Sequence, residues 1–257
     1  MSINKNMLEN KSLIEEILPI YIELYFSKSR QSIEFWNKLS SNTKCYIFGG
    51  FVVDFLNRKR SHRDIDIVID SFSDNNLKLL QKYNAIKNSF GGFKLNIDGV
   101  KIDIWAIKNT WAIKKMNYLE FDLFSLLPST SFFNSTAIIF SIQEKKLIYK
   151  DSFLNFFNNN ILDIMFEDNP YPELCIIKSY QNYLDGLYLS RNLKKYISRK
   201  FNSVFDKFET IQKRHFGEVI YTLEDIIEFY DFINSELNST KKYLPNQNSS
   251  MQLALFD

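Results

Sequence analysis

The chain has 257 residues, of which 45% are hydrophobic and 16% aromatic, enough for one large core or for a main domain with a smaller helical one. Its 32 basic and 30 acidic side chains give a net charge of +2, which excludes a uniformly basic nucleic-acid-binding surface and allows only a local patch. No apolar run is long enough to span a membrane, and Cys45 and Cys175 lack CxxC spacing, so we expect an unexported cytoplasmic protein with reduced, buried thiols and no zinc site.

The first fifty residues predict a helical start followed by a strand. Residues 11 to 40 carry apolar side chains at helical spacing, interrupted once at Pro19, which indicates two helices or one kinked helix. The segment TKCYIFGG is typical of a buried strand that ends at Gly49 and Gly50. Helical periodicity resumes in FVVDFLNRK, so we expect a strand, a tight turn and a helix in direct succession.

An alternating segment, RDIDIVID, follows this unit. Its period of two places Asp64 and Asp66 on one face of a strand and the isoleucines on the other. A short helix is predicted at DNNLKLLQKY, and FKLNIDGVKIDIWAI predicts a hairpin that turns at Asp98 and Gly99. A second hairpin is expected at AIIFSIQEKKLIYKD.

From NPYPELC onward the chain has a helical pattern rich in aromatic residues, which predicts a small all-α domain. Thr222 and Asp225 suit the start of a helix in TLEDIIEFYDFINSEL. After about Ser239 the composition is too polar to bury a core, which predicts a flexible tail before the apolar segment MQLALFD. The expected division is N-terminal helices at 1–40, a mixed strand and helix domain at 41–160, a helical domain at 161–238 and a tail at 239–257.

Three aspartates point to a divalent metal. Asp64 and Asp66 lie roughly 6 to 7 Å apart along one strand face, and the first hairpin brings the strand of Asp103 beside them. Carboxylates gathered in this way repel one another unless cations neutralise them. We therefore expect two Mg²⁺ ions, with Mn²⁺ as an alternative, held by these three residues for phosphoryl transfer. Asp122 and Asp151 are reserves for the third position, and a DxD pattern alone is also common on a solvated sheet face.

The glycine pair adds a second signal. Gly49 and Gly50 close a strand just before a helix, where unpaired amides and the helix dipole favour the β and γ phosphates of a nucleotide. A GG pair by itself often only makes a turn. Here a basic loop, RKRSHR, the DxD strand and the strand of Asp103 follow in order, and this combination favours a nucleotide site.

The order of these motifs resembles the head domain of the poly(A) polymerase and CCA-adding class, within the polymerase-beta superfamily of nucleotidyltransferases. The GG turn, the following VRD and the DID strand of that class correspond to GGFVVDFLNRKRSHRDIDIVI, and TAIIFSIQEKKLIYKDSFLNFFNNNILDIMFEDNPYPELCIIKSY is similar to its hairpin, DPF-type connection and first neck helix. The resemblance covers roughly residues 43 to 200. It implies an α+β fold, with a polymerase-beta-type head of mixed sheet and helices, a small all-α domain and a flexible C-terminal tail.

The resemblance also implies roles for individual residues. The arginine of VRD is Val53 here, and Pro172, Glu173 and Cys175 replace the arginines of the neck helix, which leaves Lys178 as the nearest basic group. Base selection of the CCA-adding kind therefore stays open. The implied roles are triphosphate binding by Gly49 and Gly50, metal binding by Asp64 and Asp66, and orientation of the site by Asp54 and Arg63.

Other polar and aromatic residues allow two interpretations. The turn FGGFK, which ends at Lys94, is either a flexible flap over the incoming nucleotide, with Lys94 on phosphate, or a plain β-turn. Trp105 and Trp111 can stack a base, although tryptophans beside an apolar strand more often fill a core. We expect His62 to be a solvated loop residue and Asp103 to accept the proton of the attacking hydroxyl.

The C-terminal segment QLALF carries a separate signal. Gln252, Leu253, Leu255 and Phe256 resemble the QLxLF peptide by which bacterial replication proteins dock to the DNA polymerase sliding clamp. A glutamine hydrogen bond and a Leu-Phe plug in an apolar pocket would support such docking. A tail packed against its own helical domain is the alternative.

These features predict a metal-dependent, template-independent nucleotidyltransferase that moves NMP or dNMP from a nucleoside triphosphate to a hydroxyl on an oligonucleotide signal, an RNA 3′ end or a protein side chain. The stretch NSFGGFKLNIDGVKIDIWAIKNTWAI resembles compact bacterial nucleotidyltransferases of antiphage defence operons. No neck or tail long enough to hold a whole tRNA is evident, so we expect a defence-type signal or a small acceptor. The alternative is a catalytically silent nucleotide-binding or clamp-binding regulator; the oligomeric state is unknown.

Overall fold

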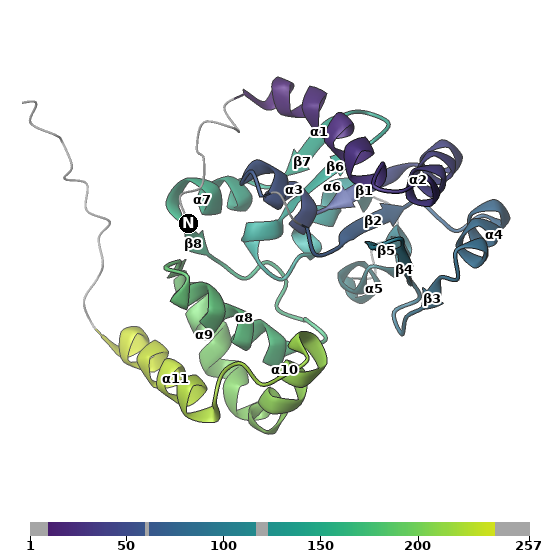
Figure 1. Ribbon diagram of the computed structural model, residues 1–257. Helices are drawn as coiled ribbons and strands as arrows, with labels where there is room; N and C mark the ends of the chain where they lie inside the picture. Colours follow the sequence, from purple (N-terminus) through teal and green to yellow (C-terminus); the bar gives the residue numbers. More distant parts are fainter. Residues whose placement is uncertain (1–9, 60–61, 117–122, 240–257) are drawn as a thin grey trace, which may run out of the picture.

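The computed structural model describes residues 10–59, 62–116 and 123–239 and has an α+β fold (Figure 1). The helices are α1 (Lys11–Phe26), α2 (Arg30–Asn42), α3 (Gly50–Leu56), α4 (Asp74–Lys82), α5 (Trp111–Met116), α6 (Leu123–Leu126), α7 (Asp151–Asn159), α8 (Pro172–Leu184), α9 (Arg191–Lys200), α10 (Phe208–Phe216) and α11 (Leu223–Asn238). The strands are β1 (Cys45–Phe48), β2 (Ile65–Ile69), β3 (Ile86–Lys87), β4 (Phe93–Ile97), β5 (Val100–Ala106), β6 (Ile138–Ser141), β7 (Lys146–Tyr149), β8 (Ile161–Leu162) and β9 (Tyr188–Leu189).

Seven strands form one mixed sheet in the order β3-β4-β5-β2-β1-β6-β7. All neighbouring pairs are antiparallel except β2 and β5, which run parallel. Both predicted hairpins are present. The β4–β5 turn places Asp98 and Gly99 at φ 50° and φ 87°, the paired left-handed conformations that an Asp-Gly hairpin turn favours.

The N-terminal segment forms two helices, and the break between them lies at residues 27–29 rather than at Pro19, which lies inside α1. The new helix starts there because Ser29 and Ser32 form a reciprocal capping box. Both helices share one hydrophobic core with the sheet, which joins Leu18 and Phe35 to the β1 residue Ile47. They therefore stabilise the face of the sheet on which they pack.

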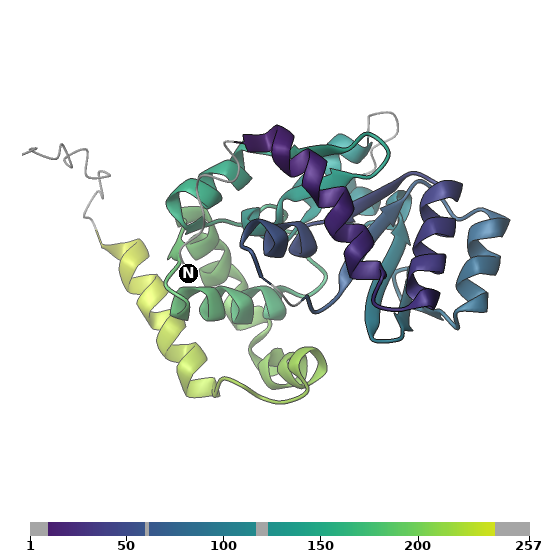
Figure 2. The same cartoon turned by 45° about the horizontal axis from the view of Figure 1, so that its top comes forward.

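A second core lies within the four helices α8 to α11, which stand beside the sheet rather than on either of its faces (Figures 1 and 2). As predicted, Thr222 and Asp225 form a capping box at the start of α11. The helical part also contains one element that the sequence pattern did not predict, a short parallel pairing of β8 with β9. No described helix is long and apolar enough to cross a membrane.

Candidate active site

The parallel pairing of β2 with β5 sets the position of the acidic residues. Asp66 and Asp103 are direct cross-strand partners, so their side chains emerge on the same face. The next strand on each side continues this row of paired residues: Lys94 of β4 is the partner of Asp103, and Phe48 of β1 is the partner of Asp66. Asp64 lies two residues before Asp66 and just ahead of the strand. Isoleucines alternate with these residues and are fully buried, and this burial fixes which face carries the acids.

Charged neighbours hold two of the three carboxylates. The Arg63 guanidinium donates to Asp64 Oδ2 from both Nε, at 3.0 Å, and one terminal nitrogen, at 2.9 Å. Lys94 Nζ lies 3.2 Å from Asp103 Oδ2. Among the described residues, Asp66 has no ion-pair partner of this kind. Burial, followed by the nearby charges of Asp64 and Asp103, raises its pKa to about 7.

The carboxylate cluster fits a hard divalent cation in its chemistry. Carboxylate oxygens are the protein ligands that Mg²⁺ uses, and a bound cation would offset the burial and the carboxylate repulsion that raise the pKa of Asp66. In the part of the chain that the structure describes, no three acidic, histidine or cysteine side chains lie together in metal-binding geometry. Asp64 and Asp103 instead hold the cationic groups of Arg63 and Lys94. Both contacts are made to Oδ2, so Oδ1 of Asp64 and Oδ1 of Asp103 are the oxygens left for a metal ion.

The glycine turn lies at the end of β1, beside this face. Gly49 has φ +40°, a conformation that L side chains rarely adopt, and a Cβ there would lie 2.9 Å from the carbonyl oxygen of Thr136. Its N–H donates to the carbonyl of Ile138 at 2.8 Å. Gly50 begins α3, and a Cβ there would meet open space. Gly49 is therefore required by the fold, whereas Gly50 leaves room for another molecule.

Asp54, on α3, lies in a small polar network. Its carboxylate lies 2.8 Å from Lys59 Nζ and 3.5 Å from His62 Nδ1. Tyr21 of α1 shares a hydrogen bond of 2.5 Å with the other ring nitrogen of His62. The expectation of a solvated His62 is wrong, because the aromatic side chains around it leave only 2% of its side chain exposed. Burial lowers the pKa of His62, so this histidine is a structural link between α1 and the loop before β2.

Two adjoining cavities open on this face of the sheet. The larger, of about 800 Å³, lies between the sheet and α8, and we call it the polar lobe. Its charged lining comes from both sides, since Asp54, Arg63 and Asp66 belong to the sheet domain and Lys178 belongs to α8. Burial, followed by the Arg63 charge, lowers the pKa of Lys178. Gly50 also lines this lobe.

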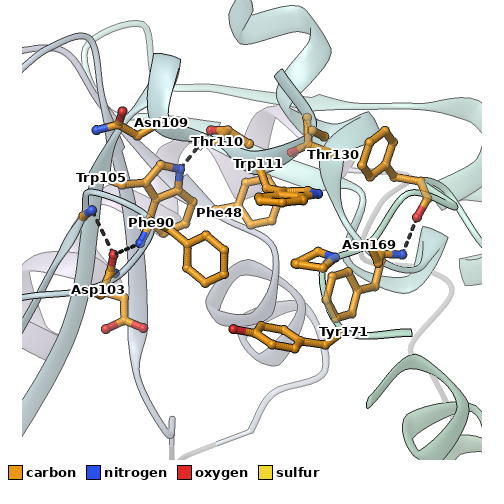
Figure 3. Close-up of a pocket in the computed structure, with 16 residues that line it drawn as sticks. Phe48, Phe90, Asp103, Trp105, Asn109, Thr110, Trp111, Thr130, Asn169 and Tyr171 are labelled. Atoms are coloured by element: carbon orange, nitrogen blue, oxygen red, sulfur yellow. Dashed lines mark hydrogen bonds between the residues drawn. The ribbon is translucent and has the colours of Figure 1, made fainter. Parts of the chain in front are cut away.

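The smaller cavity, of about 280 Å³, is lined mainly by rings, and we call it the aromatic lobe (Figure 3). Asp103 lies at its edge. Five residues line both lobes, so the two are parts of one cleft. The lobe's aromatic residues are Phe48, Phe90, Trp105, Trp111, Phe132, Phe166 and Tyr171, and the shared residues are Phe48, Phe90, Trp105, Thr130 and Phe132.

The structure thus brings most of the predicted site residues to one cleft. Three predicted site residues that the structure describes line neither lobe, namely Gly49, Asp64 and Lys94; of these, Asp64 contacts Arg63 and Lys94 contacts Asp103. Asp151 lies at the exposed start of α7, away from both lobes, and Asp122 lies outside the described residues. The tail residues also lie outside them: Gln252, Leu253, Leu255 and Phe256.

The aromatic residues depart most from expectation. Trp105 and Trp111 are partly exposed and line the cavity, although Trp105 also packs against a small buried cluster beside the sheet. Phe90 and Tyr171 were not singled out as aromatic contacts, because no local pattern marks them and they meet only through the fold. The sequence offered one sign of them, which is that aromatic residues occur within the turn-like segments FGGFK and DNPYP.

No model of a known protein family matches the chain, and no curated protein matches it in sequence. Solved structures do match. A CCA-adding enzyme in complex with ATP aligns at a TM-score of 0.58 and 15% identity, over 88% of this chain and 54% of that one. A tRNA nucleotidyltransferase complexed with a primer tRNA and an incoming ATP analog aligns at 0.55 and 17%, over 80% and 62%. The CCA-adding enzyme of Thermotoga maritima complexed with tRNA aligns at 0.53 and 16%, over 84% and 51%.

The chain therefore spans between 51% and 62% of the length of these three structures. At identities this low the likeness establishes the fold alone. The predicted α+β fold is confirmed, and the chain shares the fold of these CCA-adding enzymes and tRNA nucleotidyltransferases.

Proposed function

We propose that the protein is a template-independent nucleotidyltransferase that joins a nucleoside monophosphate, taken from a nucleoside triphosphate, to a hydroxyl group. The observation that carries this proposal is the direct pairing of Asp66 with Asp103 on the face of the sheet that meets the polar lobe, whose lining includes the cationic side chains of Arg63 and Lys178. Transfer of this kind needs carboxylates that converge on one point and positive charge for the phosphates. Both are present in one cleft. The shared fold with structures of CCA-adding enzymes supports the same reaction class.

The cleft offers a distinct task to each charged residue. Arg63 and Lys178 line the polar lobe from opposite sides and can bind the triphosphate between them. Gly50 lets a phosphate approach the backbone closely, because no side chain stands there. Asp103, at the edge of the aromatic lobe, can accept the proton of the attacking hydroxyl.

Asp64, Asp66 and Asp103 would hold the divalent ions, most simply two Mg²⁺, with Mn²⁺ as an alternative. When bound, these ions lower the pKa of the attacking hydroxyl and neutralise the charge of the leaving pyrophosphate. The raised pKa of Asp66 supports this assignment, because a cation beside it would remove the cost of its ionisation. Arg63 and Lys94 remain close enough to steady the outer carboxylates.

For the acceptor we propose a nucleic-acid 3′ hydroxyl, either an RNA end or a growing oligonucleotide signal. Matching structures include complexes with tRNA, which supports this class. A protein hydroxyl, a role in antiphage defence, the cytoplasmic location and sliding-clamp binding through the tail remain hypotheses from the sequence. The two unpaired, buried thiols suit a reducing compartment.

The test is incubation of purified protein with each labelled NTP and dNTP, Mg²⁺ and either total RNA or no added acceptor. Wild type should form labelled product that is stable to protease, and Asp64→Asn combined with Asp66→Asn should abolish it. Chelation of the metal should have the same effect. Label that protease removes would move the acceptor to a protein, and absence of label under all conditions would favour a silent nucleotide-binding regulator.

A further inference from the structure

The aromatic lobe is unusual in its exposure. All seven of its aromatic residues are partly exposed, although they come from separate segments and converge on one cavity. Exposed aromatic surface that could be buried against a ligand is costly to leave in water. The cavity volume of about 280 Å³ is close to the lower limit of small-ligand pockets, about 300 Å³. The lobe is therefore shaped for one small, flat, apolar group.

The rings are fixed in place before any ligand binds. Phe90 stands edge-on to Trp111, with centroids 5.9 Å apart, and to Tyr171, at 6.1 Å. The Phe90 segment is fastened by Asn88, whose Oδ1 accepts from the N–H groups of Phe90 and Gly92 at 3.0 Å each. A Cβ at Gly92 would lie 2.8 Å from the carbonyl of Ile104, so this turn packs tightly on β5.

The polar edges of both tryptophans are already used. Trp105 Nε1 donates to Thr110 Oγ1 at 3.0 Å, and Trp111 Nε1 donates to the carbonyl of Asp168 at 2.8 Å. What each indole still offers the cavity is apolar ring surface, which suits stacking.

Charge divides the cleft in two. Asp103 is the one charged side chain among the described residues that line the aromatic lobe, whereas Arg63 and Lys178 both line the polar lobe. Phosphates therefore belong in the polar lobe. The aromatic lobe meets it along shared residues such as Phe48 and Trp105, so it receives the group that is attached to those phosphates or to the attacking hydroxyl.

We infer that the aromatic lobe is a nucleobase site that holds the base by stacking, and that the polar lining of the site comes mainly from neutral groups such as the amides of Asn88, Asn109 and Asn169. This inference rests on the proposed function and adds how a base is recognised. The base belongs either to the incoming nucleotide or to the 3′-terminal nucleotide of the acceptor. Both present the same kind of flat ring to the lobe. Stacking distinguishes poorly between the bases, because every base has a flat face that can stack.

Tryptophan fluorescence tests the inference without any need for activity. Of the three tryptophans, Trp105 and Trp111 line the lobe, whereas Trp36 is buried against Phe26. Titration with ATP, or with a short oligonucleotide, should quench the emission, whereas inorganic triphosphate and a matching oligonucleotide with an abasic 3′ terminus should not. Phe90→Leu should weaken the binding that causes the quench. Equal responses to ligands with and without the base would overturn the inference even if the enzyme is inactive.

Kinetics then identify the source of the base. Loss of one stacking ring should raise the KM of the nucleotide that it holds by about 5- to 150-fold. We compare Phe90→Leu with Phe90→Tyr, which keeps the ring, and with Phe205→Leu, a matched change at a partly exposed phenylalanine outside both lobes.

A rise in the KM of the NTP alone assigns the lobe to the incoming nucleotide. A rise in the KM of the acceptor alone, absent when its terminal nucleotide is abasic, assigns it to the acceptor. Either result supports the site if Phe90→Tyr and Phe205→Leu behave as wild type. An active Phe90→Leu variant with both KM values unchanged rejects the nucleobase site while leaving the proposed reaction in place, and thermal unfolding of each variant identifies loss of folding.

Discussion

The two lobes of the cleft are built in different ways. The acids of the polar lobe and its glycine turn lie at β2, at the end of β1 and at the start of α3, elements with strong periodic signals. Two of the seven rings of the aromatic lobe, Phe48 and Trp105, lie in β1 and β5, and the other five lie outside the strands, in segments such as residues 88–92, 109–111 and 166–171. Charges that must converge within a few ångströms need the fixed register of a sheet, whereas loops on a rigid frame can vary to suit a particular ligand. The division suggests that chemistry resides in the sheet and selectivity in the loops.

The sharpest way to break this comparison is Asp103→Asn, because Asp103 belongs to the sheet and yet lines the aromatic lobe. If it acts in chemistry, kcat should fall by about 100-fold or more, since the variant lacks a group that binds metal and accepts a proton. The KM for nucleotide should change little. Asp98→Asn, in the turn of the same hairpin, is the matched control and should behave as wild type. Normal kcat in Asp103→Asn would move the third carboxylate elsewhere.

Alanine substitutions at the two adjacent glycines distinguish a residue needed for folding from one that leaves room for substrate in the polar lobe. Gly49→Ala forces a Cβ into a left-handed residue 2.9 Å from the Thr136 carbonyl and should destabilise the protein by about 1–3 kcal/mol. Gly50→Ala meets open space at the start of α3 and should leave stability equal or higher by up to about 1 kcal/mol. Urea unfolding measures both. A stable but inactive Gly50→Ala would indicate that substrate occupies the space beside it.

Lys178→Met tests whether α8 contributes to phosphate binding in the polar lobe. Loss of one charge-assisted contact to phosphate should raise the KM for NTP by about tenfold or more and leave base-dependent fluorescence quenching largely intact. Lys207→Met, at an exposed lysine outside both lobes, serves as the control. If Lys178→Met instead removed the fluorescence response and spared triphosphate binding, the assignment of the lobes would have to be exchanged.

The last prediction concerns the dependence of stability on pH. In metal-free protein the pKa of Asp66 is raised from 3.8 to about 7, so the folded state keeps a proton that the unfolded state releases. Stability should therefore fall as pH rises between about 4 and about 7. Asp66→Asn removes this loss and should unfold at a higher temperature than wild type at pH 8 in EDTA, by thermal scanning, with no such advantage near pH 4. Equal melting temperatures at pH 8 would show that Asp66 carries no such penalty.

The sequence was informative where side chains follow a local period. Alternation in β2 and the Asp-Gly turn predicted the strands that carry Asp66 and Asp103, and the GG pair predicted the start of α3. Contacts between distant segments have no such period. Burial of His62 depends on Tyr21 of α1, and the aromatic lobe depends on Tyr171 reaching Phe90 across 81 residues of chain, which no local pattern encodes.

The parallel register of β2 with β5 also bears on errors in folding. Side chains in a strand alternate with a period of two, so a slip of one residue would replace Asp103 opposite Asp66 by an isoleucine on the same pairing line. Such a chain would bury a carboxylate and expose apolar surface, and it could not assemble the acidic cluster. Only molecules with the native pairing of β2 and β5 would therefore be active. In a destabilised preparation, specific activity should report the fraction of chains with native strand pairing.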